Sequence, residues 1–232
     1  MARVASTRTQ NIGGAANAFI RSDAFANAAW TKTNVTPSDN NTDIVAPNGL
    51  TTGVTKLAET AVNAGHFFFP TASPLTIRAG QTFQLAFSIA KSTIGTLTNY
   101  RRVLVLVNDG TGSFVEFNPR TGLIDNTVST GGGTTTGVMF VHPQNSSWYR
   151  CCVFYKNVLS GQESLATQAV FELDNGANGA GISLAYLGDT NSGCYLAEVG
   201  CYLQNHPLQY IRTDGTPVTP ATPRGLMAYE AV

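Results

Sequence analysis

The sequence predicts an all-β antiparallel sandwich with extended N- and C-terminal arms, and three observations lead to this fold class. Threonine is abundant and favours strands, while asparagine and the 23 glycines favour turns. Short runs of alternating apolar and polar residues recur between turn signals, which is typical of an antiparallel sheet protein. Helical periodicity is almost absent. A chain of 232 residues is long enough to bury one large core.

The clearest strand is residues 82–91, where an aromatic or aliphatic side chain occupies every second position. This alternation predicts one face on a core and the other face exposed. In the segment 102–107, the residues that follow Arg102 are continuously apolar, which predicts a central strand covered on both faces. We expect further strands at residues 113–117, 123–127, 148–155, 167–173, 182–187 and 194–203.

Loops and arms are expected between and beyond these strands. Residues 129–137 are rich in glycine and threonine and predict a flexible loop. Ser22 and Asp23 are good N-caps, so one short helical turn is expected over residues 23–30. The predicted domain organisation is an N-terminal arm at residues 1–20, a sandwich at 21–213 and a C-terminal arm at 214–232.

The charge of the chain argues against two classes of partner. Only 12% of the residues are charged, and 14 basic residues balance 14 acidic ones. Nucleic acid binding needs a positive field, which a chain of zero net charge does not provide. A membrane span needs about 20 apolar residues, and no segment of the sequence approaches this length, so we expect neither partner. No apolar region of a secretory signal lies in residues 1–14, so we expect a cytoplasmic protein, unless the chain is a trimmed fragment. The low charge favours a surface that lies inside an assembly.

The four cysteines predict buried free thiols in a reducing environment. Cys151 and Cys152 are adjacent, so a strand would direct their side chains to opposite faces. Cys194 and Cys201 are separated by an odd number of positions, so a regular strand would also direct them to opposite faces. No pair has the C-x-x-C spacing, and we expect neither a zinc site nor a thioredoxin-like motif.

No motif of an enzyme stands out, and we expect no catalytic residues and no cofactor. The three histidines, His66, His142 and His206, are scattered, and neither G-x-S-x-G nor H-E-x-x-H occurs. Residues 39–43 place carboxylate and amide oxygens at alternate positions, as calcium prefers, but a solvated turn is the alternative that we favour. No metal site is therefore expected.

Aromatic residues give the candidate ligand-binding residues. An exposed ring can stack on a sugar while amide side chains bind its hydroxyls, which makes Tyr100, Tyr186 and Tyr195, with Asn191, candidates for glycan binding. Packing or a contact between subunits is the alternative for these tyrosines. Trp30 and Trp148 are expected in the core.

Three consecutive phenylalanines, Phe67, Phe68 and Phe69, are candidate assembly contacts. A strand buries one face against its own core, so we expect a neighbouring subunit to cover the other face. Further assembly contacts are expected in the arms, at Arg3, Arg8, Pro217, Pro223 and Tyr229.

Five segments carry a resemblance to a known module, and they include the run FANAAWTKTNV after Asp23, APNG at 46–49 and SWYR at 147–150. The other two are the strand at residues 80–91 and the stretch YLAEVGCYLQNHPLQYIRT at 195–213. In this order they resemble a jelly-roll module of bacteriophage virion proteins, which is related to carbohydrate-binding modules and concanavalin-like lectins. The usual GAQLE of the last motif is replaced by residues 198–204.

The resemblance implies a jelly roll and a non-enzymatic virion structural protein, assembled in the host cytoplasm. Its partners would be other virion proteins, such as the major capsid or tail proteins, and a homotrimer is expected. The function that it favours is decoration or stabilisation of the capsid or tail through subunit contacts and terminal arms. A receptor-facing tail fibre module that binds host surface glycans is the alternative, and a polysaccharide-degrading enzyme ranks last.

Overall fold

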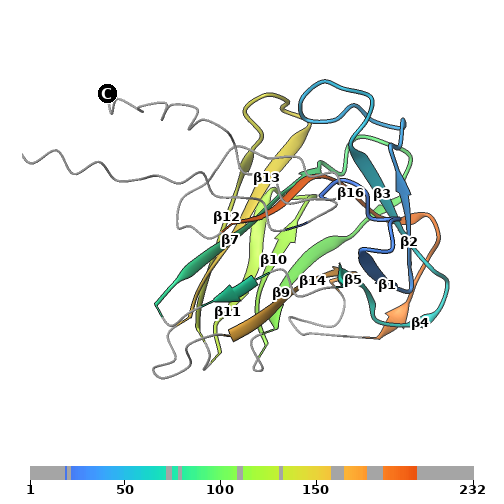
Figure 1. Cartoon of the computed structure of the whole chain (residues 1–232). Helices are drawn as coiled ribbons and strands as arrows, with labels where there is room; N and C mark the ends of the chain where they lie inside the picture. The colour runs from blue at the N-terminus through green and yellow to red at the C-terminus, as the bar shows by residue number, and fades with distance from the viewer. Residues whose placement is uncertain are drawn as a thin grey trace, which may run out of the picture.

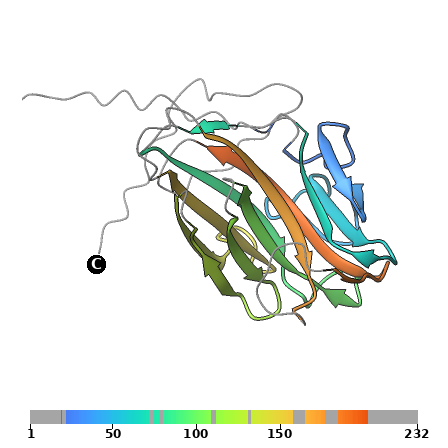
Figure 2. The ribbon, with the colours of Figure 1, turned by 90° about the horizontal axis from the view of Figure 1, so that it is seen from below.

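The computed structural model describes residue 19 and residues 22–71, 75–77, 80–108, 112–130, 133–157, 165–176 and 185–202. In this part of the chain, sixteen strands form two seven-stranded sheets and one small two-stranded sheet. The two large sheets pack face to face, as Figures 1 and 2 show. The predicted all-β antiparallel sandwich is therefore confirmed, while its jelly-roll connectivity stays a prediction.

The first sheet has seven strands, six of which form one continuous order. Its order is β1 (Trp30–Thr33), β5 (His66–Pro70), β14 (Leu165–Asp174), β9 (Arg102–Asn108), β10 (Ser113–Asn118) and β11 (Leu123–Val128). The short β6 (Leu75–Ile77) also pairs with β14. All of these pairings are antiparallel.

The second sheet joins strands from both ends of the described chain. Its order is β12 (Gly133–Val141), β13 (Trp148–Asn157), β7 (Thr82–Ala90), β16 (Ser192–Tyr202), β3 (Val54–Glu59) and β2 (Val35–Asp39). The short β8 (Asn99–Tyr100) pairs parallel with β16. The two-stranded sheet consists of β4 (Asn63–Ala64) and β15 (Tyr186–Leu187).

The main core fills the space between the two large sheets. Phe68 and Phe171 of the first sheet stack with ring centroids 4.9 Å apart, and Phe87 of the second sheet meets Phe171 edge to face at 5.6 Å. Trp30 belongs to this core, as expected. Burial of several aromatic rings of this size contributes roughly 2 kcal/mol each, so this layer holds the sandwich together.

A second apolar cluster lies on the outer face of the second sheet, the face turned away from the first sheet. Trp148 and Tyr195 are both fully buried there, beneath residues of the 44–54 segment. Trp148 donates its indole N–H to the carbonyl of Val45 at 2.9 Å. The central strands of the second sheet are therefore covered on both faces.

This outer layer corrects the prediction for the strand at residues 82–91. In β7 every residue from Phe83 to Ala90 is buried, so its polar-looking face is not exposed. Small residues such as Ala86 and Ser88 occupy that face because other side chains pack closely over it. The prediction that residues 102–107 are covered on both faces is confirmed, since residues 103–107 are all buried.

Two local predictions are wrong. Residues 133–137, expected in a flexible loop, begin the nine-residue strand β12, because threonine has high β-propensity and β13 offers it a complete ladder. Residues 23–30 form turns without a helix, with Asn27 N–H donating to Ala24 O and Trp30 N–H donating to Asn27 O. Of the strand expected at 182–187, residues 185–187 are described, and Tyr186–Leu187 is a short strand. The two arms, apart from Phe19, lie outside the described residues.

All four cysteines are buried and free, as predicted. Cys151 faces the main core and Cys152 the outer side, which confirms their opposite orientation. Cys194 and Cys201, however, both face the main core. A register shift in β16 between Ala197 and Gly200 adds one residue, so an odd spacing brings both thiols to the same face.

Candidate functional site

The β-bulge of β16 places an acidic side chain where a regular strand would have none. Ala197 pairs with Ser88 and Gly200 with Ala86, so three steps along β16 match two steps along β7. Glu198 sits in the extra step with φ of 54°, in the left-handed region. This backbone conformation costs a non-glycine residue roughly 1–2 kcal/mol. The bulge thus holds Glu198 on the outer face of the second sheet, next to Ala197.

Three donors converge on one oxygen of Glu198, two from neighbouring strands and one from the residue that follows β12. Ser88 Oγ donates to Oε2 at 2.8 Å, and His142 Nε2 lies 3.1 Å from the same atom. Arg150 Nη1 lies 3.5 Å from Oε2 and donates to the backbone carbonyl of Glu198 at 2.9 Å. Among the described residues, no hydrogen bond is made to the other oxygen, Oε1. We call Ser88, His142, Arg150 and Glu198 the Glu198 cluster.

The Glu198 cluster holds its carboxylate in the ionised form. Burial by itself would raise the pKa of Glu198, since its side chain is only 11% exposed. The hydrogen bond from His142, the charge of Arg150 and the hydrogen bond from Ser88 outweigh burial and lower the pKa below its usual range. Glu198 is therefore a fixed acceptor at neutral pH and is unsuited to act as a general acid.

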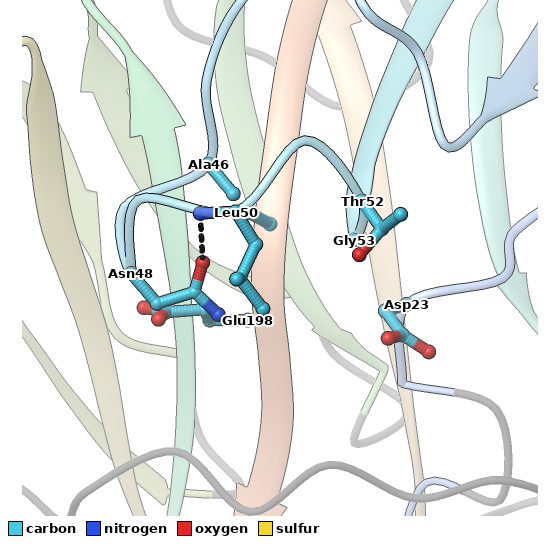
Figure 3. A pocket seen from close by; sticks show the side chains of 8 residues that line it. Asp23, Ala46, Asn48, Leu50, Thr52, Gly53 and Glu198 are labelled. Atoms are coloured by element: carbon cyan, nitrogen blue, oxygen red, sulfur yellow. Dashed lines mark hydrogen bonds between the residues drawn. The ribbon is translucent and has the colours of Figure 1, made fainter.

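A pocket of about 210 Å³ opens beside Glu198 (Figure 3). It is lined by Asp23, Ala46, Asn48, Leu50, Thr52, Gly53, Ala197 and Glu198. Its wall is the 46–53 loop, in which Leu50 N–H donates to Asn48 Oδ1 at 3.0 Å and Ala46 N–H donates to Leu50 O at 2.9 Å. The lining offers acceptor oxygens and a few apolar side chains, so it suits a small ligand rich in hydrogen-bond donors.

A second carboxylate cluster lies on the outer face of the first sheet. Arg102 of β9 binds Glu116 of β10 at 3.1 Å and Asp125 of β11 at 2.9 Å, and lies 4.0 Å from Asp174. Asp125 also sits at a register shift, between strands β10 and β11. Asn118 Nδ2 donates to the same Asp125 oxygen at 2.8 Å. We call Arg102, Glu116, Asp125 and Asp174 the Arg102 cluster.

The Arg102 cluster has three acids and one cation, and this imbalance has a clear electrostatic effect. Burial and the hydrogen bond and charge of Asp174 raise the pKa of Glu116 to about 7, although Arg102 opposes the shift. Among the described residues, no group of three or more histidine, cysteine or acidic side chains is arranged to hold a metal ion. Arg102 is the cation that these carboxylates share.

The three tyrosines proposed for sugar stacking are buried. Tyr100, Tyr186 and Tyr195 are 5%, 6% and 0% exposed, so none presents the open ring face that stacking needs. Tyr100 and Tyr195 pack together in the outer apolar cluster, with ring centroids 6.1 Å apart. The packing alternative is the one that the structure supports for these tyrosines, whereas Asn191 is exposed.

Tyr186 belongs instead to a buried ion-pair network. Its hydroxyl donates to Glu59 Oε1 at 2.5 Å, and Arg101 binds both oxygens of Glu59, at 2.6 and 2.9 Å. Burial and the adjacent Glu59 raise the pKa of Tyr186 well above its usual range. This network fastens β15 to β3, which is a structural role.

The phenylalanine triplet alternates across β5. Phe68 is fully buried in the main core, whereas Phe67 and Phe69 are half-buried on the outer face. These two rings stack with centroids 6.2 Å apart, which gives each of them partial cover from the other. Whether a subunit covers them stays a prediction. Arg3, Arg8, Pro217, Pro223 and Tyr229 lie outside the described residues.

The acidic turn at residues 39–43 uses its oxygens inside the protein. Asp39 accepts hydrogen bonds from the backbone N–H of Phe25 and Ala26, at 3.0 and 2.9 Å. Asp43 accepts from Lys56 Nζ at 3.1 Å and from the hydroxyl of Tyr195 at 2.8 Å. The hydrogen bond from Thr96, followed by those from Tyr195 and Lys56, lowers the pKa of Asp43. The structure therefore supports the turn alternative.

Sequence reasoning did not identify the Glu198 cluster as a site. His142 and Arg150 look unremarkable in the sequence, and Ser88 was assigned to an exposed face. The one available signal was Glu198 itself, the single charged residue in the otherwise apolar stretch 194–203.

The search of protein-family models finds no match to this sequence, and the search of curated proteins finds none either. Within the described residues, no helix is long and apolar enough to span a membrane.

Proposed function

We propose that the protein is a non-enzymatic structural module of a bacteriophage virion, which binds other virion proteins on the capsid or tail through its surface. Its β-sandwich is consistent with this role. The sequence resemblance to phage virion modules, given above, favours a virion as the assembly.

One observation carries the assembly role: an apolar surface on strand β12. Val138 and Phe140 are 42% and 39% exposed and lie on the same face of the outermost strand of the second sheet, and Val141, which is 49% exposed, follows on the opposite face. Clustered exposure of large apolar side chains marks a surface that another protein covers. A net charge of zero adds little repulsion to the close packing of many copies.

The Glu198 cluster supports a role without catalysis. A hydrolase of glycosidic bonds needs a protonated carboxylic acid and a second carboxylate on either side of the bond. Glu198 is held ionised by its neighbours and does not supply this acid. Glu116 has a pKa raised to about 7, but its side chain is only 3% exposed and is bound to Arg102, which favours a structural use of this group as well.

Binding of host surface glycans is the second candidate function, and the pocket beside Glu198 favours it. The free Oε1 of Glu198 and the amide of Asn48 can accept or donate hydrogen bonds to sugar hydroxyls, while Leu50 offers an apolar contact for ring C–H groups. For this candidate function we propose the 46–53 loop, and not the buried tyrosines, as the glycan-binding surface.

Immunolabelling of intact virions tests the first proposal. An antibody against residues 214–232 should label the head at regular spacing if the protein decorates the capsid, or the tail if it belongs there. Absence of the protein from purified virions, measured by mass spectrometry of their proteins, would contradict the proposal.

A glycan array tests the second candidate on the purified full chain. Binding that is lost in Asn48→Ala/Leu50→Ala, and kept in the matched control Val62→Ala, would place a sugar in the pocket. Val62 is a suitable control because it is also exposed, at 41%, and does not line the pocket. No binding by the unmodified chain, or equal binding by both variants, would reject this site.

A further inference from the structure

The four edge strands of the two large sheets differ in how they discourage pairing with another protein. Exposed edges are normally protected by charged residues, proline or bulges. Strand β1 carries Lys32, β2 carries Pro37, and β11 carries a register shift with Asp125. Strand β12 has none of these, because residues 133–141 contain no charge and no proline and pair with β13 without a register shift.

The hydrogen bonds around β13 establish which backbone groups of β12 face outward. In an antiparallel ladder each residue directs its N–H and its C=O to the same neighbouring strand, and the direction alternates along the chain. His142 N–H donates to Trp148 O at 2.8 Å, so residue 142 faces β13. Residues 140 and 138 therefore also face β13, and the odd-numbered residues of β12 face the open edge.

The beginning of this edge is closed by the preceding turn. Gly133 N–H donates to Thr130 O at 3.1 Å, and Thr135 N–H donates to Ser129 Oγ at 2.9 Å. The Ser129 hydroxyl in turn donates to Thr135 O at 3.3 Å. From Gly137 onward, the part of the chain that the structure describes provides no partner for the edge-facing groups of Gly137, Met139 and Val141.

The unpaired backbone groups and the exposed apolar side chains therefore coincide on one short stretch, residues 137–141. Val138 and Phe140 point to the outer face of the second sheet, like the residues Cys152 and Arg150 opposite them on β13. Both remain more than one third exposed. A strand added at this edge would bond the backbone groups and cover both side chains at once.

We propose that β12 pairs antiparallel with β12 of a second copy of this chain, about a twofold axis at Met139. This register brings Met139 opposite its own mate and Gly137 opposite Val141 of the other copy. Since all three residues direct N–H and C=O to the edge, the pairing forms six backbone hydrogen bonds. This pairing rests on the proposed function, because it identifies the protein that covers the apolar surface of β12.

The side chains fit the same twofold register. Val138 lies opposite Phe140 of the other copy, and the reverse holds across the axis, so each exposed apolar side chain gains an apolar neighbour. The strand carries no charge, so no like charges meet when it pairs with itself. A second copy of the chain therefore pairs the open backbone groups and also covers the exposed apolar side chains. No partner of different sequence is needed.

Sedimentation of the full chain tests the contact. We expect a dimer for the unmodified protein and for Val138→Lys/Phe140→Glu, because the register places lysine opposite glutamate. In Val138→Lys/Phe140→Lys, lysine meets lysine, and we expect dimerisation to weaken about 100-fold. Leu187→Lys, at another exposed apolar position (70% exposed), is the matched control and should dimerise normally. Circular dichroism and the melting temperature establish that each variant is folded.

Cross-linking tests the register independently of affinity. Residues 138 and 140 of the two copies would form non-hydrogen-bonded pairs with Cα atoms about 4.5 Å apart, within disulfide range. A mixture of Val138→Cys and Phe140→Cys chains should give a disulfide-linked dimer under mild oxidation, whereas each variant alone should not. The four native cysteines are buried and give the background rate.

The outcomes separate this contact from the virion role. A monomer at all concentrations, an oligomer unaffected by Val138→Lys/Phe140→Lys, or equal cross-linking in the mixed and single samples would overturn the twofold pairing. These measurements use purified protein, so failure of virion labelling leaves them unaffected. A twofold contact of this kind produces dimers, so a trimer, which the sequence resemblance implies, would also contradict it.

Discussion

The Glu198 cluster and the Arg102 cluster are built from similar parts and differ in their balance of charge. Each lies on the outer face of one sheet, each has an acid at a register shift, and each has one arginine. In the Glu198 cluster one acid meets arginine, histidine and serine. In the Arg102 cluster three acids share one arginine.

The difference in balance decides the direction of the pKa shift. Glu198 and Glu116 are both buried, at 9% and 2% exposed, and burial alone raises the pKa of each. Surplus donors reverse this effect at Glu198, and surplus negative charge reinforces it at Glu116. Burial therefore makes the pKa of an acid sensitive to neighbouring groups, and these groups determine whether the pKa rises or falls.

The two acids consequently contribute to folding stability with opposite dependence on pH. The folded-state pKa of Glu198 is lowered, so its stabilisation is present above pH 4.5 and is lost as the pH falls through the folded pKa. The folded-state pKa of Glu116 is raised, so its ionisation destabilises the fold increasingly as the pH rises from 4.5 to about 7.

The largest expected effect is that of Arg150→Met, which removes the cation of the Glu198 cluster. We expect a loss of about 3 kcal/mol in the free energy of unfolding, because a buried carboxylate is left without its charge partner. Arg102→Met should cost less, about 2 kcal/mol, since Arg102 and Asp125 are 31% and 24% exposed and water solvates them. Urea unfolding at neutral pH measures both, and equal losses would contradict the comparison.

An intermediate effect is expected for Glu116→Gln, and it depends on pH. The substitution removes an acid that is costly to ionise, so the variant should be about 1 kcal/mol more stable than the unmodified protein at about pH 8. At about pH 5 the folded protein already holds Glu116 protonated, and the two should be similar. The midpoints of urea unfolding at both pH values give the test. A variant that is less stable than the unmodified protein at the higher pH would contradict this prediction.

The smallest effect is expected for His142→Gln. The glutamine amide can still donate to Glu198 but is a more flexible donor, so it weakens one of three hydrogen bonds to this carboxylate, for a loss of about 0.5 kcal/mol. With this donor weakened, the pKa of Glu198 rises, so acid unfolding should begin at a higher pH. Tryptophan fluorescence during acid titration reports this shift, with Gln144→Ala, a change at a neighbouring exposed residue, as the control. An unchanged acid transition would show that His142 does not lower the pKa of Glu198.

Much of the fold follows from local sequence pattern. The apolar run within residues 102–107 predicted a central strand covered on both faces, and Trp30 and Trp148 were expected in the core. These predictions succeeded because burial of large apolar side chains dominates the free energy of folding. The strand at 133–141 was partly missed because glycine and threonine occur in loops as well as in strands, and the ladder with β13 decided between them.

The sites depended on contacts that sequence spacing does not contain. Tyr100, Tyr186 and Tyr195 were candidates for an exposed surface, yet an outer layer of loops and the Glu59–Arg101 pair bury them. Ser88, His142, Arg150 and Glu198 come from four separate segments, and their convergence follows from strand order.

Local pattern was sufficient to predict an antiparallel β-sandwich with buried free thiols, because alternation and strand propensity act over a few residues. Contacts between distant strands were needed to establish which faces are covered, where one added residue turns Glu198 outward and Cys201 inward, and which edge remains open at Gly137, Met139 and Val141 among the described residues. Side-chain direction in a sheet has a period of two, so a single bulge reverses every position that follows it, and local pattern does not reveal the bulge.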